Sequence, residues 1–214
     1  MNVLLDLDGT LTDSRRGIVA CIQHALRALG HEAPEEAALR RYIGPPLLAA
    51  FRELLPVERS ADAEQAIAAY RERFIDVGMF ENDVYPQVPE ALSLLRERGA
   101  RLFLATGKPR VYARRILEHF RLSHYFDEIY GSELDGRLTD KVELIAHVLS
   151  KSGLRSAQTI MVGDRHHDAV GAISNAVRAV GVLWGYGSRT ELAEAGVETF
   201  LETPGELGHL NLQR

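Results

Sequence analysis

The sequence predicts a doubly wound α/β fold with a mostly parallel sheet and a small all-helical domain inserted after the first strand. Short apolar segments alternate with segments of helical periodicity from about residue 85 onward. This alternation implies parallel strands joined by right-handed crossovers. Residues 14–80 show helical periodicity and no strand pattern, which indicates a helical insertion.

The elements follow in order along the chain. Residues 3–5 are apolar and predict a buried strand, and helices are expected at 14–30, after Pro34, at 49–55 and at 61–77. Ser14 and Gly30 are typical of the start and the stop of the first helix. Beyond Pro86 the sequence predicts helices at 89–98, 109–120, 140–152, 168–176 and 189–195, and strands at 101–106, 127–130, 159–162, 178–183 and 199–201. The predicted domains are a core of residues 1–13 and 84–214 and a helical domain of residues 14–83.

Composition narrows the classes of protein. The 214 residues are 46% apolar and 26% charged, which is ordinary for a globular protein, and the net charge of −5 disfavours a nucleic-acid or anionic-membrane partner. No apolar run approaches the roughly 18–20 residues of a membrane span, and Asp6 and Asp8 interrupt the N-terminal apolar run, so no signal peptide is expected. The single cysteine, Cys21, excludes an intrachain disulfide. We expect a cytoplasmic monomer or homodimer.

Polar residues gather where the predicted strands end. The set consists of Asp6 and Asp8 after the first strand, Thr106-Gly107-Lys108 after the second, Gly163-Asp164 with Asp168 after the fourth, and Lys141 at a helix start. Ligands of open α/β sheets bind outside the carboxyl ends of the strands, so these residues are expected to converge on one crevice.

The chemistry of this set points to a cation and a phosphate. Asp6 and Asp8 lie two residues apart on an extended chain and point to the same side, where like charges repel unless a cation or a proton intervenes. Asp164 adds a third negative charge, and Mg²⁺ is the simplest neutraliser. Lysine is rare, at three of 25 basic residues, and Lys141 could supply a compact positive charge. One carboxylate is then available for nucleophilic attack.

Each of these residues also has an ordinary structural role. Asp8-Gly9 is a common turn, Thr106 could cap a helix, and Asp164 and Asp168 suit helix starts. Lys141 could be a solvated helix residue. Their joint placement at strand ends favours the site.

Competing motifs fail on spacing. A calcium loop starting at Asp6 would need glycine where Leu11 stands. Gly107-Lys108 lacks the upstream glycine of a phosphate-binding loop, and Gly185-Tyr186-Gly187 lacks the third glycine of a dinucleotide fingerprint and is expected to shape a loop. The adjacent His166-His167 have poor spacing for one metal ion.

The ordered motifs Asp6-Leu7-Asp8-Gly9-Thr10, Thr106-Gly107-Lys108, Lys141 and Gly163-Asp164 with Asp168 resemble those of the haloacid dehalogenase (HAD) superfamily of phosphohydrolases. The helical insertion resembles the C1 cap of its phosphoglycolate-phosphatase-like branch, and residues 131–143 are more similar to 5′-nucleotidase relatives. The resemblance implies a Rossmann-like core with a helical cap.

The resemblance also implies roles for the acidic residues. Asp6 would attack phosphorus and form an aspartyl-phosphate, and Asp8 would protonate the leaving oxygen and then activate water. Asp6, the backbone carbonyl of Asp8, and Asp164 would hold Mg²⁺. Asp168 would support the metal site or orient Lys141.

The remaining candidates would bind substrate. Thr106, Gly107 and Lys141 would hold the phosphoryl oxygens, together with Leu7 and Lys108. Arg16 and Arg52 are the insertion arginines expected to contact substrate.

The expected function is a Mg²⁺-dependent phosphatase acting on a small phosphorylated metabolite, with phosphoglycolate and nucleoside 5′-monophosphates as candidates. Asp8 favours phosphoryl chemistry over dehalogenation, and the insertion has no lysine of the phosphonatase kind. A phosphomutase of the same superfamily and a non-catalytic phosphoacceptor domain are the alternatives. The insertion counts against the phosphoacceptor, since such domains need no cap.

Overall fold

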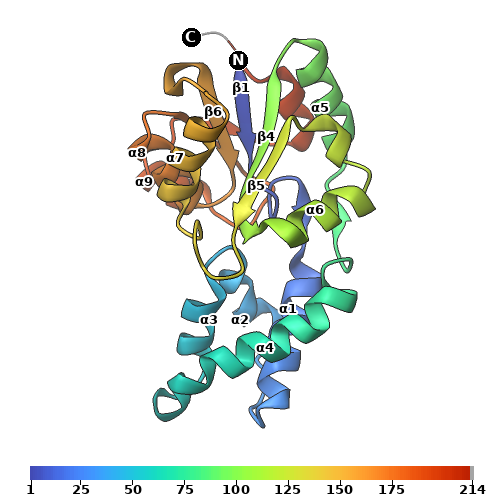
Figure 1. The fold of residues 1–214 in the computed structure, drawn as a ribbon, viewed down its shortest axis with the longest axis vertical. Helices are drawn as coiled ribbons and strands as arrows, with labels where there is room; N and C mark the ends of the chain where they lie inside the picture. Colours follow the sequence, from blue (N-terminus) through green and yellow to red (C-terminus); the bar gives the residue numbers. More distant parts are fainter. Residues whose placement is uncertain (213–214) are drawn as a thin grey trace. The chain divides into compact units, whose positions relative to one another are not determined.

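The computed structural model describes residues 1–212, and the chain divides into two compact units (Figure 1). One unit, the core, consists of Met1–Asp13 and the chain from Val84 onward. The other, the helical insertion, is Ser14–Asp83.

A six-stranded parallel sheet forms the centre of the core. Its strands are β1 (Asn2–Leu5), β4 (Arg101–Pro109), β5 (Glu128–Ser132), β6 (Thr159–Gly163), β7 (Arg178–Val182) and β8 (Thr199–Leu201). They lie in the order β5-β4-β1-β6-β7-β8, and all neighbours are parallel. The chain order reverses at β1, since β4 and β5 lie on one side of it and β6 to β8 on the other. In such sheets the crevice for ligands opens at the carboxyl ends of the strands around this reversal.

Helices cover both faces of the sheet, as a doubly wound fold requires. They are α5 (Val88–Glu97), α6 (Arg110–His119), α7 (Lys141–Lys151), α8 (His166–Ser174) and α9 (Arg189–Glu194). Figure 1 shows α5 and α6 on one side of the sheet and α7, α8 and α9 on the other. The predicted α/β fold class is therefore confirmed.

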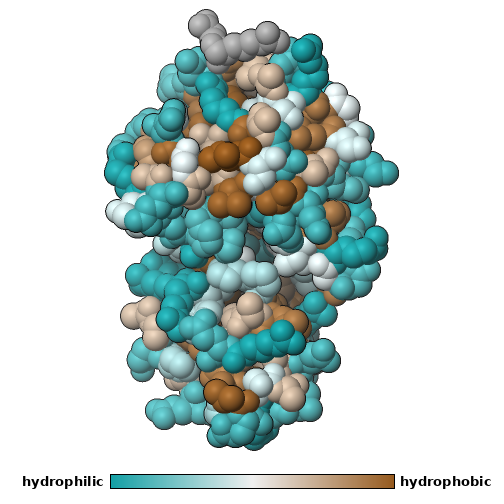
Figure 2. Space-filling view, turned by 90° about the vertical axis from the view of Figure 1, so that its left-hand side faces the viewer, coloured by the Kyte–Doolittle hydropathy of each residue, from teal (hydrophilic) through white to brown (hydrophobic). Residues whose placement is uncertain are grey.

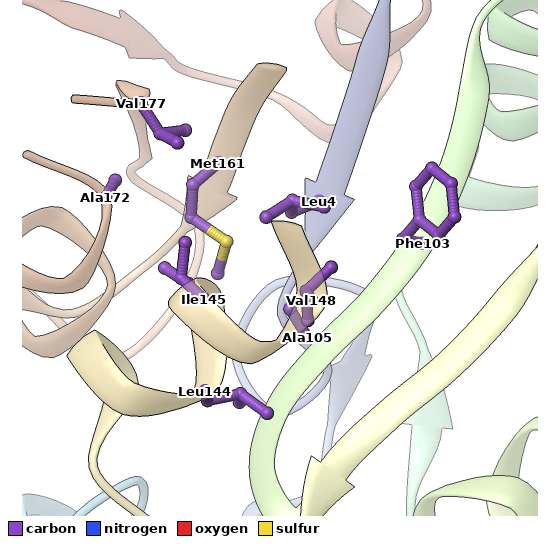
Figure 3. Close-up of a cluster of buried hydrophobic side chains, with 9 residues drawn as sticks. All are labelled: Leu4, Phe103, Ala105, Leu144, Ile145, Val148, Met161, Ala172 and Val177. Atoms are coloured by element: carbon purple, nitrogen blue, oxygen red, sulfur yellow. The ribbon is translucent and has the colours of Figure 1, made fainter. Parts of the chain in front are cut away.

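The core between the sheet and α7 determines where the first residue of that helix lies (Figure 3). Leu4 of β1, Phe103 of β4 and Met161 of β6 supply the sheet side and are almost fully buried. The helix contributes its buried face, Leu144, Ile145 and Val148. Because Lys141 precedes Ile145 by about one helical turn, this apolar packing also fixes the position of that lysine.

The helical insertion contains α1 (Arg15–Ala28), α2 (Glu36–Leu39), α3 (Leu47–Leu54) and α4 (Ala63–Arg73). The short strands β2 (Thr12–Asp13) and β3 (Asp83–Val84), where the chain enters and leaves it, pair with each other. Within the insertion, Gly17 of α1 allows a close approach to the segment after α4, because a Cβ at Gly17 would lie 1.9 Å from the carbonyl oxygen of Gly78.

Some boundaries differ from the sequence-based expectation, for local reasons. The helix expected over 61–77 ends at Arg73, and Phe74–Gly78 continues as a π-helical turn. The helix expected from Asp168 begins two residues earlier, because the Asp168 side chain accepts a hydrogen bond from the backbone N–H of Arg165 at 3.2 Å and caps the helix start. The strand expected to end at Thr106 continues to Pro109 with a shift of register.

No helix within residues 1–212 is long and apolar enough to cross a membrane. On the face shown in Figure 2, hydrophobic residues are scattered among hydrophilic ones.

We expect Ile145→Ala to lower the free energy of unfolding by about 2–5 kcal/mol, because it opens a cavity in the packed interior between α7 and the sheet. Urea denaturation followed by circular dichroism measures this. The control is Val170→Ala in α8, whose side chain is exposed and whose loss should change stability by less than about 0.5 kcal/mol. Equal effects of the two substitutions would contradict the packing described.

Candidate active site

Asp6 lies directly after β1, in the middle of the sheet. Its backbone N–H donates to the carbonyl of Val162 at 3.0 Å, so the residue stays attached to β6 after the strand ends. The loop that follows turns tightly, with Gly9 at φ +85° and the Leu7 carbonyl accepting from Leu11 and Thr12. Asp6 is therefore held at the crevice, and its side chain is buried.

Lys141 joins two of the carboxylates. Its Nζ lies 2.7 Å from Asp6 Oδ1 and 2.6 Å from Asp168 Oδ1, and it donates to the Ala105 carbonyl at 2.9 Å. Asp140 caps α7 by accepting from two backbone N–H groups, which starts the helix at Lys141. The ammonium of Lys141 therefore connects α7, β4, the residue after β1 and α8.

Three buried carboxylates form a candidate metal centre. Oxygen atoms of Asp6, Asp164 and Asp168 all lie within 4.8 Å of one another. Asp164 is fully buried, and its Oδ2 accepts from the backbone N–H of Tyr186 at 2.7 Å, whereas its Oδ1 has no hydrogen-bond partner among residues 1–212. A buried carboxylate oxygen without a partner is costly, and a cation would satisfy it. The donor set consists of hard oxygen atoms and fits Mg²⁺.

The electrostatics of the site favour binding of a cation. Burial raises the pKa of Asp6 to about 6, and Asp168 and Asp8 add to this, against the opposing effect of Lys141. Burial and the charges of Asp168 and Asp6 raise the pKa of Asp164 well above its ordinary range. Burial alone would lower the pKa of Lys141, but the two carboxylates it contacts raise it above its ordinary value. Lys141 therefore stays charged, whereas burial disfavours the ionised forms of Asp6 and Asp164, which a bound cation would favour.

The loop after the regular part of β4 lies beside this cluster. Thr106 is buried, and its Oγ1 accepts a hydrogen bond from the backbone N–H of Lys108 at 3.3 Å. The carbonyl of Gly107 accepts from Ser132 Oγ at 2.7 Å. Lys108, expected on the phosphate, places its Nζ 2.7–2.8 Å from the carboxylate oxygens of Asp8. Lys108 is thus the counter-ion of Asp8 in this structure.

The structure adds a segment that the sequence analysis assigned only to a loop. Gly185 and Gly187 pack against Asp164: a Cβ at Gly185 would lie 2.4 Å from Asp164 Cβ, and one at Gly187 would lie 1.9 Å from the Asp164 carbonyl oxygen. The Tyr186 hydroxyl, between the two glycines, donates to Asp13 at 3.0 Å, and Trp184 Nε1, just before them, donates to the Thr10 carbonyl at 3.0 Å. The signal in the sequence was the pair of glycines in the segment after β7, which ends at Val182.

The two substrate-contact candidates of the helical insertion and the adjacent histidines complete the set of singled-out residues. Arg16 and Arg52 are exposed on α1 and α3 of the helical insertion. His166 Nδ1 lies 2.8 Å from Glu191, and the His166 ring lies 3.8 Å from that of His167. Within residues 1–212 neither histidine belongs to a cluster with metal-ligand geometry.

The α/β fold and the cluster of carboxylates around a lysine agree with the family that sequence comparison identifies. The model of the family described as haloacid dehalogenase-like hydrolase matches residues 3–182, and the chain belongs to this family. It is 48% identical to a 5′-nucleotidase of Pseudomonas aeruginosa over 191 residues, which cover 89% of this chain and 86% of that protein. The crystal structure of a predicted phosphatase from Clostridium acetobutylicum superposes with a TM-score of 0.91, at 40% identity, and covers 97% of this chain and 96% of that one.

A third relative carries a different name. The tyrosine-protein kinase PtkA of Mycobacterium tuberculosis is 40% identical over 185 residues, which cover 86% of this chain and 62% of that protein. Family, fold and relatives together place this chain among the HAD-like phosphatases.

We expect Asp164→Asn to stabilise the metal-free protein at pH 8, raising the midpoint of thermal unfolding by about 4 °C. A carboxyl whose pKa is raised by folding stabilises the fold at low pH and loses that contribution as the pH rises through the folded-state pKa. The asparagine amide does not ionise, so this loss of stability at high pH does not occur, and its oxygen can still accept a hydrogen bond from the Tyr186 N–H.

Thermal unfolding in chelator measures the stability of the metal-free protein, and thermal unfolding in Mg²⁺ measures the effect of the cation. Added Mg²⁺ should raise the midpoint of the wild type but not of Asp164→Asn. The exposed Asp76→Asn is the control and should behave as wild type. A midpoint for Asp164→Asn below that of the wild type in chelator would contradict this account of the site.

Proposed function

We propose that this chain is a Mg²⁺-dependent phosphatase that hydrolyses a nucleoside 5′-monophosphate through an aspartyl-phosphate on Asp6. The observation that supports it best is the buried Asp6 carboxylate, which Lys141 contacts. Close to it, Asp164 Oδ1 has no hydrogen-bond partner in the described part of the chain. Phosphoryl transfer depends mainly on positioning and charge neutralisation, and this arrangement suits both needs.

The reaction has two displacements. A carboxylate oxygen of Asp6 attacks phosphorus while the bond to the leaving oxygen breaks, and Asp8 gives that oxygen a proton. Asp8 then takes a proton from a water molecule that attacks the aspartyl-phosphate, which releases inorganic phosphate and regenerates Asp6. Asp8 is proposed for both steps because it follows Asp6 by two residues; its ion pair with Lys108 would open when the phosphate binds that ammonium, which frees Asp8 to carry the proton.

The surrounding residues neutralise charge. Asp6, the carbonyl of Asp8, and Asp164 would hold Mg²⁺, which when bound supplies positive charge next to the phosphoryl oxygens. Lys141, the Thr106 hydroxyl and the backbone N–H of Gly107 bind those oxygens. Leu7 contributes through its backbone, and Lys108 moves from Asp8 to the phosphate.

Asp168 is proposed as the residue that positions Lys141. It contacts the ammonium at 2.6 Å and also lies in the carboxylate cluster. The helical insertion, residues 14–83, is proposed as a cap that excludes water and carries specificity, with Arg16 and Arg52 contacting substrate.

The proposed substrate preference is taken from two of the relatives. The 5′-nucleotidase relative shares 48% identity over most of both chains, and this favours a nucleoside 5′-monophosphate over phosphoglycolate. The PtkA relative favours a second candidate, transfer of a phosphoryl group to a protein tyrosine. An aspartyl-phosphate that hands its phosphoryl group to a hydroxyl instead of water would need the same site residues.

The test is the release of phosphate from nucleoside monophosphates, phosphoglycolate, sugar phosphates and an aryl phosphate, with Mg²⁺ and with chelator. Asp6→Asn should lower release by at least about 10³-fold because it removes the nucleophile and keeps the shape. Substantial turnover by this variant would exclude the mechanism. Isomerised sugar phosphate without free phosphate would identify a mutase, and phosphotyrosine on an added protein would identify the second candidate.

Lys141→Arg should lower kcat/KM by about 100-fold or more, because a planar guanidinium does not fit a cavity built for an ammonium in contact with two carboxylates. The matched control is Lys151→Arg, at the other, exposed end of the same helix, which should keep wild-type rates. Steady-state kinetics on the best substrate of the panel decide the point. Wild-type rates in Lys141→Arg would show that Lys141 does not hold the phosphate.

A further inference from the structure

A cleft of about 470 Å³ opens on the core beside the carboxyl end of β5. Its lining comes from the start of α6 and from the segment after β5: Arg110, Val111, Arg114, Ser132, Glu133, Leu134 and Asp135. The volume is within the range of small-molecule sites. All of these residues belong to the core unit.

The cleft adjoins residues 106–108, which follow the regular part of β4. Ser132, in its wall, donates to the carbonyl of Gly107 at 2.7 Å. A Cβ at Gly131 would lie 2.5 Å from the carbonyl oxygen of Lys108 and 2.9 Å from the backbone of Arg110, so these backbones are in direct contact. β5 is the second strand from β1, and two strand spacings amount to about 10 Å. If a phosphate ester is bound at Asp6, its leaving group must extend over about this distance to enter the cleft.

The loop that forms one wall is closed by its own hydrogen bonds. Glu133 N–H donates to the Arg137 carbonyl at 2.8 Å, and Gly136 N–H donates to the Glu133 carbonyl at 3.0 Å. Asp135 accepts from the backbone and the side chain of Arg137 at 3.1 and 2.8 Å. This wall is therefore preorganised, which lowers the entropic cost of binding.

The chemistry of the lining is mixed and its formal charge is zero. Arg110 lies 3.5 Å from Glu133, and Arg114 lies 3.9 Å from Glu128. Both ion pairs are exposed and long, so they are weak, and a ligand can replace either partner at little cost. Val111 and Leu134 are about half exposed, at 48% and 49%, although both are apolar. The cleft therefore offers planar guanidinium groups, carboxylates and an apolar surface close together.

We propose that this cleft is the subsite for the nucleoside part of the substrate. The inference rests on the proposed function, because it assigns a place to the leaving group of a nucleoside 5′-monophosphate. A guanidinium stacks on a nucleobase, and a carboxylate accepts hydrogen bonds from ribose hydroxyls. Leu134 and Val111 provide the apolar contact for the base. A lining without net charge suits an uncharged nucleoside better than the carboxylate of glycolate.

The test measures binding without turnover, in the Asp6→Asn protein with Mg²⁺. Calorimetric titration with the four ribonucleoside 5′-monophosphates and with inorganic phosphate gives the affinities. Adding Arg114→Ala should weaken binding of the best nucleotide about tenfold, the effect of losing one charged contact, and leave phosphate binding unchanged. Adding Arg101→Ala is the matched control: this exposed arginine is the first residue of β4, at the opposite end of the strand from the catalytic loop.

The outcomes separate this inference from the proposed function. Unchanged nucleotide affinity in the Arg114→Ala protein would overturn the subsite, even if the wild type hydrolyses the nucleotide. Weaker binding of inorganic phosphate to the same extent as nucleotide would also overturn it, because the effect would then concern the phosphate. A tenfold loss confined to nucleotides would support the subsite, even if the wild type released no phosphate and the proposed function failed.

Discussion

The contact of one ammonium with two buried carboxylates is the interaction on which the candidate site depends. Lys141 reaches Asp6 after β1 and Asp168 in α8, so it connects segments that are far apart in the sequence. Removing such a buried partner would leave uncompensated charge, which is strongly unfavourable. The lysine is held in turn by the apolar face of α7, whose packing on β1, β4 and β6 is that of an ordinary hydrophobic core. The same helix, α7, therefore carries the lysine of the candidate site and part of the hydrophobic core.

The same cluster shows a conflict between stability and function. Three carboxylates within 4.8 Å of one another, with one lysine among them, are not an arrangement that favours folding of the metal-free chain. The raised pKa of Asp6 and Asp164 expresses this cost. Proteins retain such an unfavourable cluster of buried carboxylates where a ligand compensates for it, and here a bound cation would do so. The glycines packed against Asp164 belong to the same arrangement, because a side chain at Gly185 or Gly187 would occupy the position of that residue.

Much of this fold followed from the sequence, because strand and helix periodicities are local and strand order is constrained by crossover handedness. The grouping of Asp6, Asp164 and Lys141 could be expected since each stands at a strand end or a helix start. The pairing of Lys108 with Asp8 and the contact of the Tyr186 N–H with Asp164 could not, because both depend on how distant loops pack. The early start of α8 was missed for a related reason: Asp168 acts both as a cap and as a site residue.

The pairing of β2 with β3 has a consequence for how such a chain can diversify. The polypeptide leaves the core at Thr12–Asp13 and returns at Asp83–Val84, and these two short strands lie side by side. An excursion whose ends are already adjacent adds little loop-closure cost as it lengthens, since that cost grows only slowly with length. The 69 residues between the two strands, 14–82, can therefore be exchanged for a different module while the register of the sheet stays the same. The paired strands therefore allow one core to carry insertions of different length and sequence.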